Sequence, residues 1–284
     1  MKNSKIGTFA ASLLALFLGA AFVAHPAVAQ TQEDGKRLDT PVTTPAPAPA
    51  RAPVASAPVT KEALLRKAET SYYVLQSLGL KSFNCTVVPD WPKFISDSGQ
   101  LALVSPVRYS AVIDQQGAST VTAYRTDDAA TDPSVNQIVD GVKQTVEGFF
   151  QTWNNMVLSG IFSAASDPNL AYSTDMTGYH LKQTDGGTSV ELTLTRDALL
   201  TVMKVVTPAS TVVMQPKYTK TPNGLLLTSA NSVINNGAQT VDFQIDYQLI
   251  EGLELPSKVA YQVKLPAQTV AIEINLSDYQ IAKN

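Results

Sequence analysis

The chain has 284 residues, 44% of them apolar and 16% charged, which is enough to bury an ordinary core and excludes a wholly disordered protein. Its 21 basic and 24 acidic side chains give a net charge of −3. Nucleic acid is therefore not an expected partner, because phosphate binding needs a basic surface. The single cysteine, Cys85, excludes a disulfide framework and a cysteine-only metal site. We expect Cys85 to be a buried free thiol, and we expect no metal and no cofactor.

The first 29 residues are typical of a secretory signal peptide. Lys2 and Lys5 precede an apolar stretch over residues 9–24, and Ala27-Val28-Ala29 forms a small-residue cleavage site. The apolar stretch is shorter than the ~20 residues that a membrane anchor needs. We therefore predict cleavage near Ala29 and a location in the periplasm or outside the cell.

The next segment, residues 30–58, is rich in proline and alanine and contains almost no side chain that could enter a core. This composition predicts a disordered linker. Residues 59–284 are then expected to form a single folded domain.

Two helices are expected in this domain. Thr60 suits an N-cap, apolar residues recur at helical spacing as far as Leu78, and Gly79 suits the end of the helix. A longer helix is predicted over residues 134–162, after Asp132-Pro133, and either Gly148 or Gly160 could interrupt it.

The rest of the domain has the pattern of β-strands. Residues 82–89, 107–114 and 119–125 are β-prone, and from Leu170 onward apolar and polar residues alternate between turn signals such as Asn236-Gly237. Consecutive strands with short turns indicate an antiparallel meander, and a meander of eight or more strands tends to curl. We predict an α+β, mostly β fold: an incomplete antiparallel β-barrel with helices packed as a lid in its concave face.

The common catalytic motifs do not occur in this sequence. It has no G-x-S-x-G, no Walker A sequence, no G-x-G-x-x-G and no H-E-x-x-H. The acids Asp127, Asp128 and Asp132 are interpreted as a solvated loop with a helix cap. After signal cleavage the only histidine is His180, which lies in a strand-like run with no identifiable carboxylate or serine partner. We therefore predict a protein that is not an enzyme, and a hydrolase using His180 stays as an alternative.

The C-terminal third resembles the periplasmic outer-membrane lipoprotein carrier superfamily, which also includes lipoprotein-sorting, mycobacterial lipid-transport and envelope-stress sensor proteins. The N-terminal order is similar as well, with Pro106-Val107-Arg108-Tyr109 leading into a hairpin. The resemblance implies a half-open barrel, an apolar cavity under a helical lid, and no catalytic residues. The segments that carry it are 218–225, 241–247, 252–259 and 270–281.

The aromatic half of the long helix has two interpretations. Its residues alone favour ordinary core, whereas the resemblance favours the wall of a cavity that binds lipid or the acyl chains of lipoproteins, with an envelope membrane or a protein as a further partner. An envelope sensor or interaction module on the same fold, without a transported ligand, is the alternative. The candidate ligand-binding residues are Phe149, Phe150, Trp153, Met156, Val157, Tyr109 and Tyr247.

Overall fold

The computed structural model describes residues 59–127, 129–162 and 170–284. The predicted signal peptide, the linker and Asp128 lie outside these ranges, so the expectations about them stay predictions. The helices are α2 (Lys61–Ser71), α3 (Trp91–Phe94), α4 (Ser98–Val104) and α5 (Asn136–Trp153), with short helical turns η1 (Gln76–Leu78), η2 (Pro133–Val135), η3 (Asn154–Leu158) and η4 (Asn235–Gly237).

All described strands belong to one antiparallel sheet. Its order is β3-β2-β1-β12-β11-β10-β9-β8-β7-β6-β5-β4, so the sheet is open and its edges are β3 and β4. The strands are β1 (Leu80–Pro89), β2 (Val107–Ile113), β3 (Ser119–Arg125), β4 (Ala171–Thr174), β5 (Tyr179–Asp185), β6 (Thr188–Leu194), β7 (Leu200–Val206), β8 (Thr211–Thr221), β9 (Gly224–Ile234), β10 (Gln239–Ile250), β11 (Leu253–Leu265) and β12 (Gln268–Lys283).

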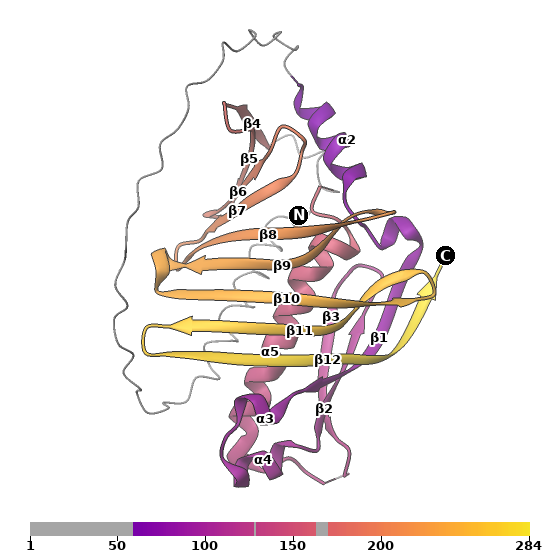
Figure 1. Ribbon diagram of the computed structural model, residues 1–284, viewed down its shortest axis with the longest axis vertical. Helices are drawn as coiled ribbons and strands as arrows, with labels where there is room; N and C mark the ends of the chain where they lie inside the picture. The colour runs from indigo at the N-terminus through magenta and orange to yellow at the C-terminus, as the bar shows by residue number, and fades with distance from the viewer. Residues whose placement is uncertain (1–58, 128, 163–169) are drawn as a thin grey trace, which may run out of the picture.

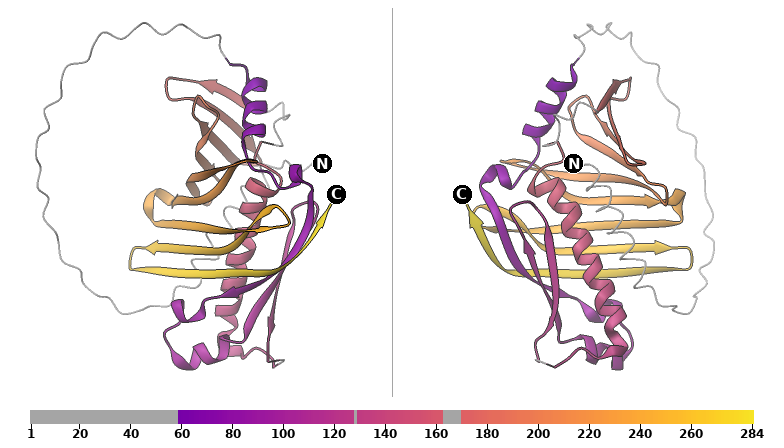
Figure 2. Two further views of the ribbon diagram at one scale, coloured as in Figure 1. Left: turned by 45° about the vertical axis from the view of Figure 1, so that its right-hand side comes forward. Right: turned by 180° about the vertical axis from the view of Figure 1, so that it is seen from behind.

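The sheet curls around α5. Figures 1 and 2 show β8–β12 as a curved surface with α5 running across its concave side, and β1–β3 turning around the same helix. Strand alternation decides which face is turned inward: Val241, Phe243 and Ile245 of β10 are buried, while Gln244 and Asp246 are exposed on the convex side. The predicted mostly β, incomplete antiparallel barrel with a helix in its concave face is confirmed.

The first helix is shorter than predicted. Thr60 caps it as expected by accepting a hydrogen bond from the Ala63 amide, but α2 ends at Ser71 because Tyr72 adopts an extended conformation. Tyr72 forms a parallel bridge with Leu225, and the Tyr73 amide donates to the Leu225 carbonyl at 3.1 Å. Pairing with a distant strand therefore overrides the helical periodicity that continues to Leu78.

Tyr72 and Tyr73 together hold one end of the barrel. The Leu200 amide donates to the Tyr72 hydroxyl at 2.6 Å, and the Glu254 amide donates to the Tyr73 hydroxyl at 2.8 Å. With the Leu225 contacts, this dipeptide, which we call the tyrosine clamp, reaches the β6–β7, β8–β9 and β10–β11 turns. The turns at the other ends of these strands lie away from it.

The long helix is continuous through Gly148, which is buried, so of the two alternatives, an interruption at Gly148 or at Gly160, the first does not occur. The helix widens into the π-helical turn η3 and ends near Gly160, whose φ of +77° is the left-handed conformation that favours glycine. Asp132 accepts a hydrogen bond from the Ser134 amide at 2.8 Å at its start, as a cap should. The short helices α3 and α4 were not predicted.

Candidate functional site

The structure brings Phe149, Phe150 and Trp153 of α5 together with Tyr247 of β10, and Met156 and Val157 follow in η3. Tyr109 of β2 lies apart from them, against Val139, which is about 21 Å from Trp153 along α5. Tyr247 is partly buried, and the side chains of the other six are at most 4% exposed. Trp153 Nε1 donates to the Tyr247 hydroxyl at 3.1 Å, and this hydroxyl donates to the Leu227 carbonyl at 2.6 Å. The Tyr109 hydroxyl donates to the Val139 carbonyl at 2.9 Å.

Aromatic rings fill the space around Trp153. Its ring lies 6.3 Å from Phe149 in a stacked arrangement and 6.0 Å from Phe83 of β1 in an edge-to-face arrangement. Burial raises the pKa of Tyr109 and of Tyr247 well above the usual value, so both phenols stay protonated at neutral pH. This cluster is therefore apolar and uncharged, and contact between these residues and a ligand stays a prediction.

The half of the concave face beyond α5 is apolar. Figures 1 and 2 show β8–β12 continuing past α5 toward the β7–β8, β9–β10 and β11–β12 turns, and no described helix lies over that half. The strand register aligns its inward side chains in rows, and the surface that they form, which we call the distal face, is buried. Its members are Met203, Val205, Val212, Met214, Ser232, Ile234, Val241, Phe243, Tyr261, Val263 and Ile272.

The distal face is too apolar to stay in contact with water without a large penalty. Nine of its side chains are aliphatic, methionine or phenylalanine, and removing them from water is worth on the order of 20 kcal/mol. The side of α5 turned away from β1 and β2 carries small buried residues, namely Gly141, Thr145, Gly148 and Thr152. The distal face is thus a surface that favours an apolar cover.

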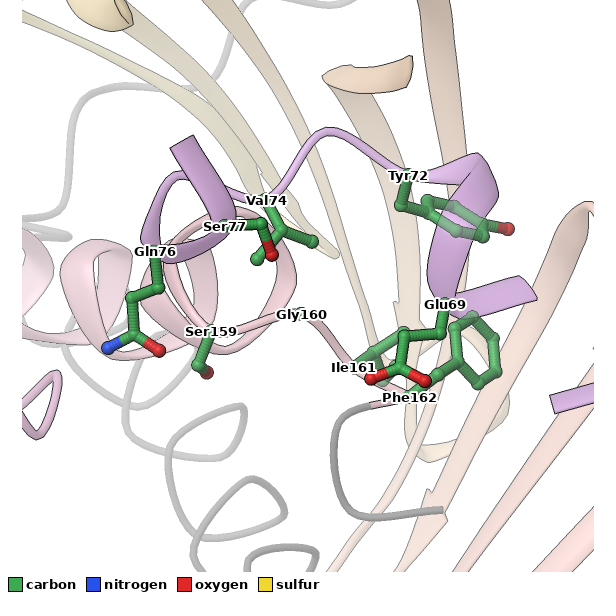
Figure 3. Close-up of a pocket in the computed structure, with 9 residues that line it drawn as sticks. All are labelled: Glu69, Tyr72, Val74, Gln76, Ser77, Ser159, Gly160, Ile161 and Phe162. Atoms are coloured by element: carbon green, nitrogen blue, oxygen red, sulfur yellow. The ribbon is translucent and has the colours of Figure 1, made fainter. Parts of the chain in front are cut away.

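A smaller pocket lies between residues 69–77 and the end of η3 (Figure 3). Its volume is about 290 Å³, at the low end for ligand pockets, and Tyr72, Val74, Ile161 and Phe162 give it apolar walls. Gly160 allows this close approach, since a Cβ there would lie 2.9 Å from Val74 Cγ2. Polar side chains line the pocket as well, so its walls are mixed; they are Glu69, Gln76, Ser77 and Ser159.

His180 does have a carboxylate partner, contrary to the sequence-based expectation. Its Nε2 lies 2.9 Å from Asp175 Oδ2, and its Nδ1 lies 3.4 Å from the Thr193 hydroxyl. The β4–β5 turn brings Asp175 back beside β5, which strand spacing alone does not reveal. Asp175 also accepts hydrogen bonds from Thr177 and from the Gly178 amide, so it closes the turn.

The turn that Asp175 closes should weaken in acid. Hydrogen bonds, first from the Thr177 side chain and then from backbone amides and His180, hold the pKa of Asp175 well below its usual value near 4. A depressed carboxylate pKa adds stability above the unfolded-state pKa, and this stability is lost as the pH falls through the folded-state pKa. Asp175→Asn should therefore lower Tm at pH 7, and the difference from wild type should shrink between pH 5 and pH 2 in thermal melts.

Asp185→Asn, in the β5–β6 turn, is the control for removing an acidic side chain from a neighbouring turn. A difference between Asp175→Asn and wild type that stays constant from pH 7 to pH 2 would contradict the assigned role of the carboxylate.

Asp127 and Cys85, which the sequence analysis also considered, both have structural roles. Asp127 pairs with Arg125 at 2.6 Å, which lowers the pKa of Asp127 to about 2, and Cys85 is a buried free thiol as predicted.

Among the described residues, no group of three or more His, Cys, Asp or Glu side chains could hold a metal ion. In the same part of the chain, no helix is long and apolar enough to cross a bilayer.

Three hydroxyls on or near the distal face were not singled out by the sequence analysis. The hydroxyls of Ser232, Tyr261 and Thr152 are buried and have no hydrogen-bond partner. Alternation could have identified the first two, because Ser232 lies between inward Ala230 and Ile234, and Tyr261 occupies an inward position of β11. Burial raises the pKa of Tyr261, so its hydroxyl remains a donor.

No family model matches the chain. No curated protein matches it either. A crystal structure of MucB in complex with MucA(peri) aligns with 10% identity over 78% of this chain and 97% of that chain, with a TM-score of 0.14. Such a low TM-score does not establish a shared fold, so the resemblance to lipoprotein carriers is not confirmed.

Proposed function

We propose that this chain is an exported, non-enzymatic binding protein whose distal face holds an apolar ligand such as the acyl chains of a lipid or lipoprotein. The observation that carries the proposal is a curved apolar sheet face over which no described helix lies. The helix α5 would form one wall of the site, and the distal face would form its floor.

The free energies involved suit binding and release of a lipid. Each buried CH₂ group contributes ~0.8 kcal/mol, so a sixteen-carbon chain gains on the order of 12 kcal/mol by leaving water. A bilayer offers the same chain a similar gain. Transfer between protein and membrane is therefore nearly balanced, and such a protein needs no nucleotide to drive it.

The proposal predicts that the exported protein binds an apolar dye, N-phenyl-1-naphthylamine, and that lipid displaces the dye. Val263→Glu places a carboxylate on the distal face and should reduce dye affinity at least tenfold, because ligand would then bury a charge. Circular dichroism checks that the variant is folded, because Val263 is 0% exposed and an unpaired buried carboxylate is costly.

Gln262→Glu is the matched control, because Gln262 is the preceding residue of β11 and is exposed on the convex side. It should bind dye like wild type, and Val263→Gln replaces Val263→Glu if the charged variant does not fold. Wild-type protein that binds no dye and carries no lipid in native mass spectrometry would refute the proposal and favour an interaction module that transports no ligand. Unchanged dye binding by the Val263 variants would place the site elsewhere.

The Asp175–His180–Thr193 arrangement favours a second candidate function, ester hydrolysis. A carboxylate, an imidazole and a hydroxyl follow one another at 2.9 and 3.4 Å, the order used in nucleophilic hydrolases. His180→Ala should abolish activity on short-chain esters if this candidate is correct. Equal rates of ester hydrolysis for His180→Ala and wild type would exclude this candidate function, and the contact of His180 with Asp175 would then be structural.

A further inference from the structure

The distal face is buried although no described helix lies over it (Figures 1 and 2). Val263 of β11 lies between β10 and β12 and is 0% exposed. Val112 of β2 lies between β1 and β3 on the outer side of the sheet and is 48% exposed. Neighbouring strands alone therefore leave much of a valine side chain in contact with water, so a further layer of atoms must lie over Val263.

The helix α5 does not supply this layer. It meets the sheet at Tyr247 of β10, whose hydroxyl accepts from Trp153, and at Tyr109 of β2, which donates to Val139. Val241 precedes Tyr247 by six residues along β10, which corresponds to roughly 20 Å. A helix with its side chains is ~10–12 Å across, so α5 does not reach Val241.

The cover must therefore come from residues outside the described ranges, which are 1–58, 128 and 163–169. Residues 163–169 contain no large apolar side chain, and residues 25–58 contain three valines and one leucine among prolines and charged residues. Residues 9–24 contain four leucines, three phenylalanines and a valine, and no charge. Their composition is the one that matches an apolar face.

The dimensions of residues 9–24 also suit the distal face. As a helix, these 16 residues would be ~24 Å long. The distal face extends over the six strands β7–β12, and five strand spacings give a width of roughly 24 Å. Neither surface carries a charged side chain. The two surfaces can therefore pack together without burying a charge.

The connection between this segment and α2 is long enough. The distal turns are separated from the start of α2 by at most the length of β9, ~36 Å, and that of α2, ~16 Å. Residues 25–58 span roughly 110 Å when extended. Attachment to the same chain gives the segment a local concentration on the order of 1 mM, which favours this cover over a second molecule.

We infer that residues 9–24 cover the distal face in the uncleaved chain, and that removal of the predicted signal peptide opens the face to ligand. The opening step rests on the proposed function, whereas the cover does not. A chain that folds before export would then have no free apolar site, and only the exported protein would have one.

Photo-crosslinking tests the cover. The full chain is made in a cell-free reaction without membranes, so that residues 1–29 remain attached, with p-benzoylphenylalanine in place of Phe17. Ultraviolet light should join position 17 to peptides from β8–β11 of the same molecule, which mass spectrometry of the monomer identifies. The same probe in place of Leu38 is the control and should give at least tenfold less of these products. Equal yields from both positions, or products confined to dimers, would overturn the inference.

Dye binding tests the opening. The exported protein should bind N-phenyl-1-naphthylamine at least tenfold more tightly than the full chain, because residues 9–24 compete for the same face. Leu16→Glu with Phe17→Glu in the full chain should restore the affinity of the exported protein, since the charges would be buried in an apolar contact. Leu38→Glu with Val42→Glu is the matched control and should leave the affinity of the full chain low.

The outcomes separate this inference from the proposed function. Equal dye affinities of the full chain and the exported protein would overturn the inference and leave the proposed function intact. An exported protein that binds no dye would refute the proposed function together with the opening step. Cross-linking from position 17 would still decide whether residues 9–24 cover the face.

Discussion

Replacing Trp153 with alanine is expected to lower the free energy of unfolding by ~3–5 kcal/mol, the range for truncating a fully packed tryptophan. The ring is 1% exposed and contacts Phe149 and Phe83, and its Nε1 donates to the Tyr247 hydroxyl. Alanine would remove these contacts and leave a cavity between α5 and the sheet. Urea unfolding followed by circular dichroism measures the change.

Trp153→Phe with Tyr247→Phe, each alone and combined, separates the hydrogen bond from the packing in a double-mutant cycle. A loss below ~1 kcal/mol for Trp153→Ala would show that the tryptophan ring fills no packed core. The cluster on α5 would then be a cavity wall, and the ligand site would extend from the distal face to Trp153.

Replacing Gly224 with alanine should destabilise the protein by about 2–5 kcal/mol, through a forced backbone conformation and the loss of hydrogen bonds. Gly224 has a φ of +122°, and a Cβ at this position would lie 2.6 Å from the Tyr72 carbonyl carbon and 2.8 Å from the Tyr73 nitrogen. These are backbone atoms and cannot rotate aside. The substitution should therefore push the tyrosine clamp away from β9.

Gly252→Ala is the control for the glycine conformation itself. Gly252 also has a positive φ, +82°, but a Cβ there meets no atom within 4 Å. It should lose only the ~1–2 kcal/mol that a left-handed conformation costs an L-residue. Thermal and urea melts of the two variants give the comparison, and equal losses would mean that the contact with Tyr72 contributes nothing.

Much of the fold could be predicted from the sequence because local patterns specify it. Period-two alternation in residues 241–249 predicted a strand with one buried side, and Asp132-Pro133 predicted the start of the long helix. The pairing of β1 with β12 could not be predicted, because it depends on residues such as Leu80 and Lys283 that are far apart in the chain. The early end of α2 has the same cause, since Leu225 holds Tyr72 in an extended conformation.

The site was harder to predict than the fold. Helical periodicity identified the cluster around Trp153, because long apolar side chains give a strong signal. The distal face gave a weaker sequence signal. The alternation around Val241 and Val263 shows that their side chains point inward, but it is the same whether or not another part of the protein covers them. The partner of His180 was missed because Asp175 approaches it only through the β4–β5 turn.

The neighbours of β1 also affect how long folding takes in the cell. One side of this strand pairs with β2, which follows it closely, but the other side pairs with β12, the last strand of the chain. About 190 residues separate Pro89 from Lys283, and at ~5–20 residues per second a ribosome needs roughly 10–40 s to add them. During that interval the sheet lacks its final strand, so the chain stays incompletely folded, the state in which a polypeptide can be threaded through a membrane pore.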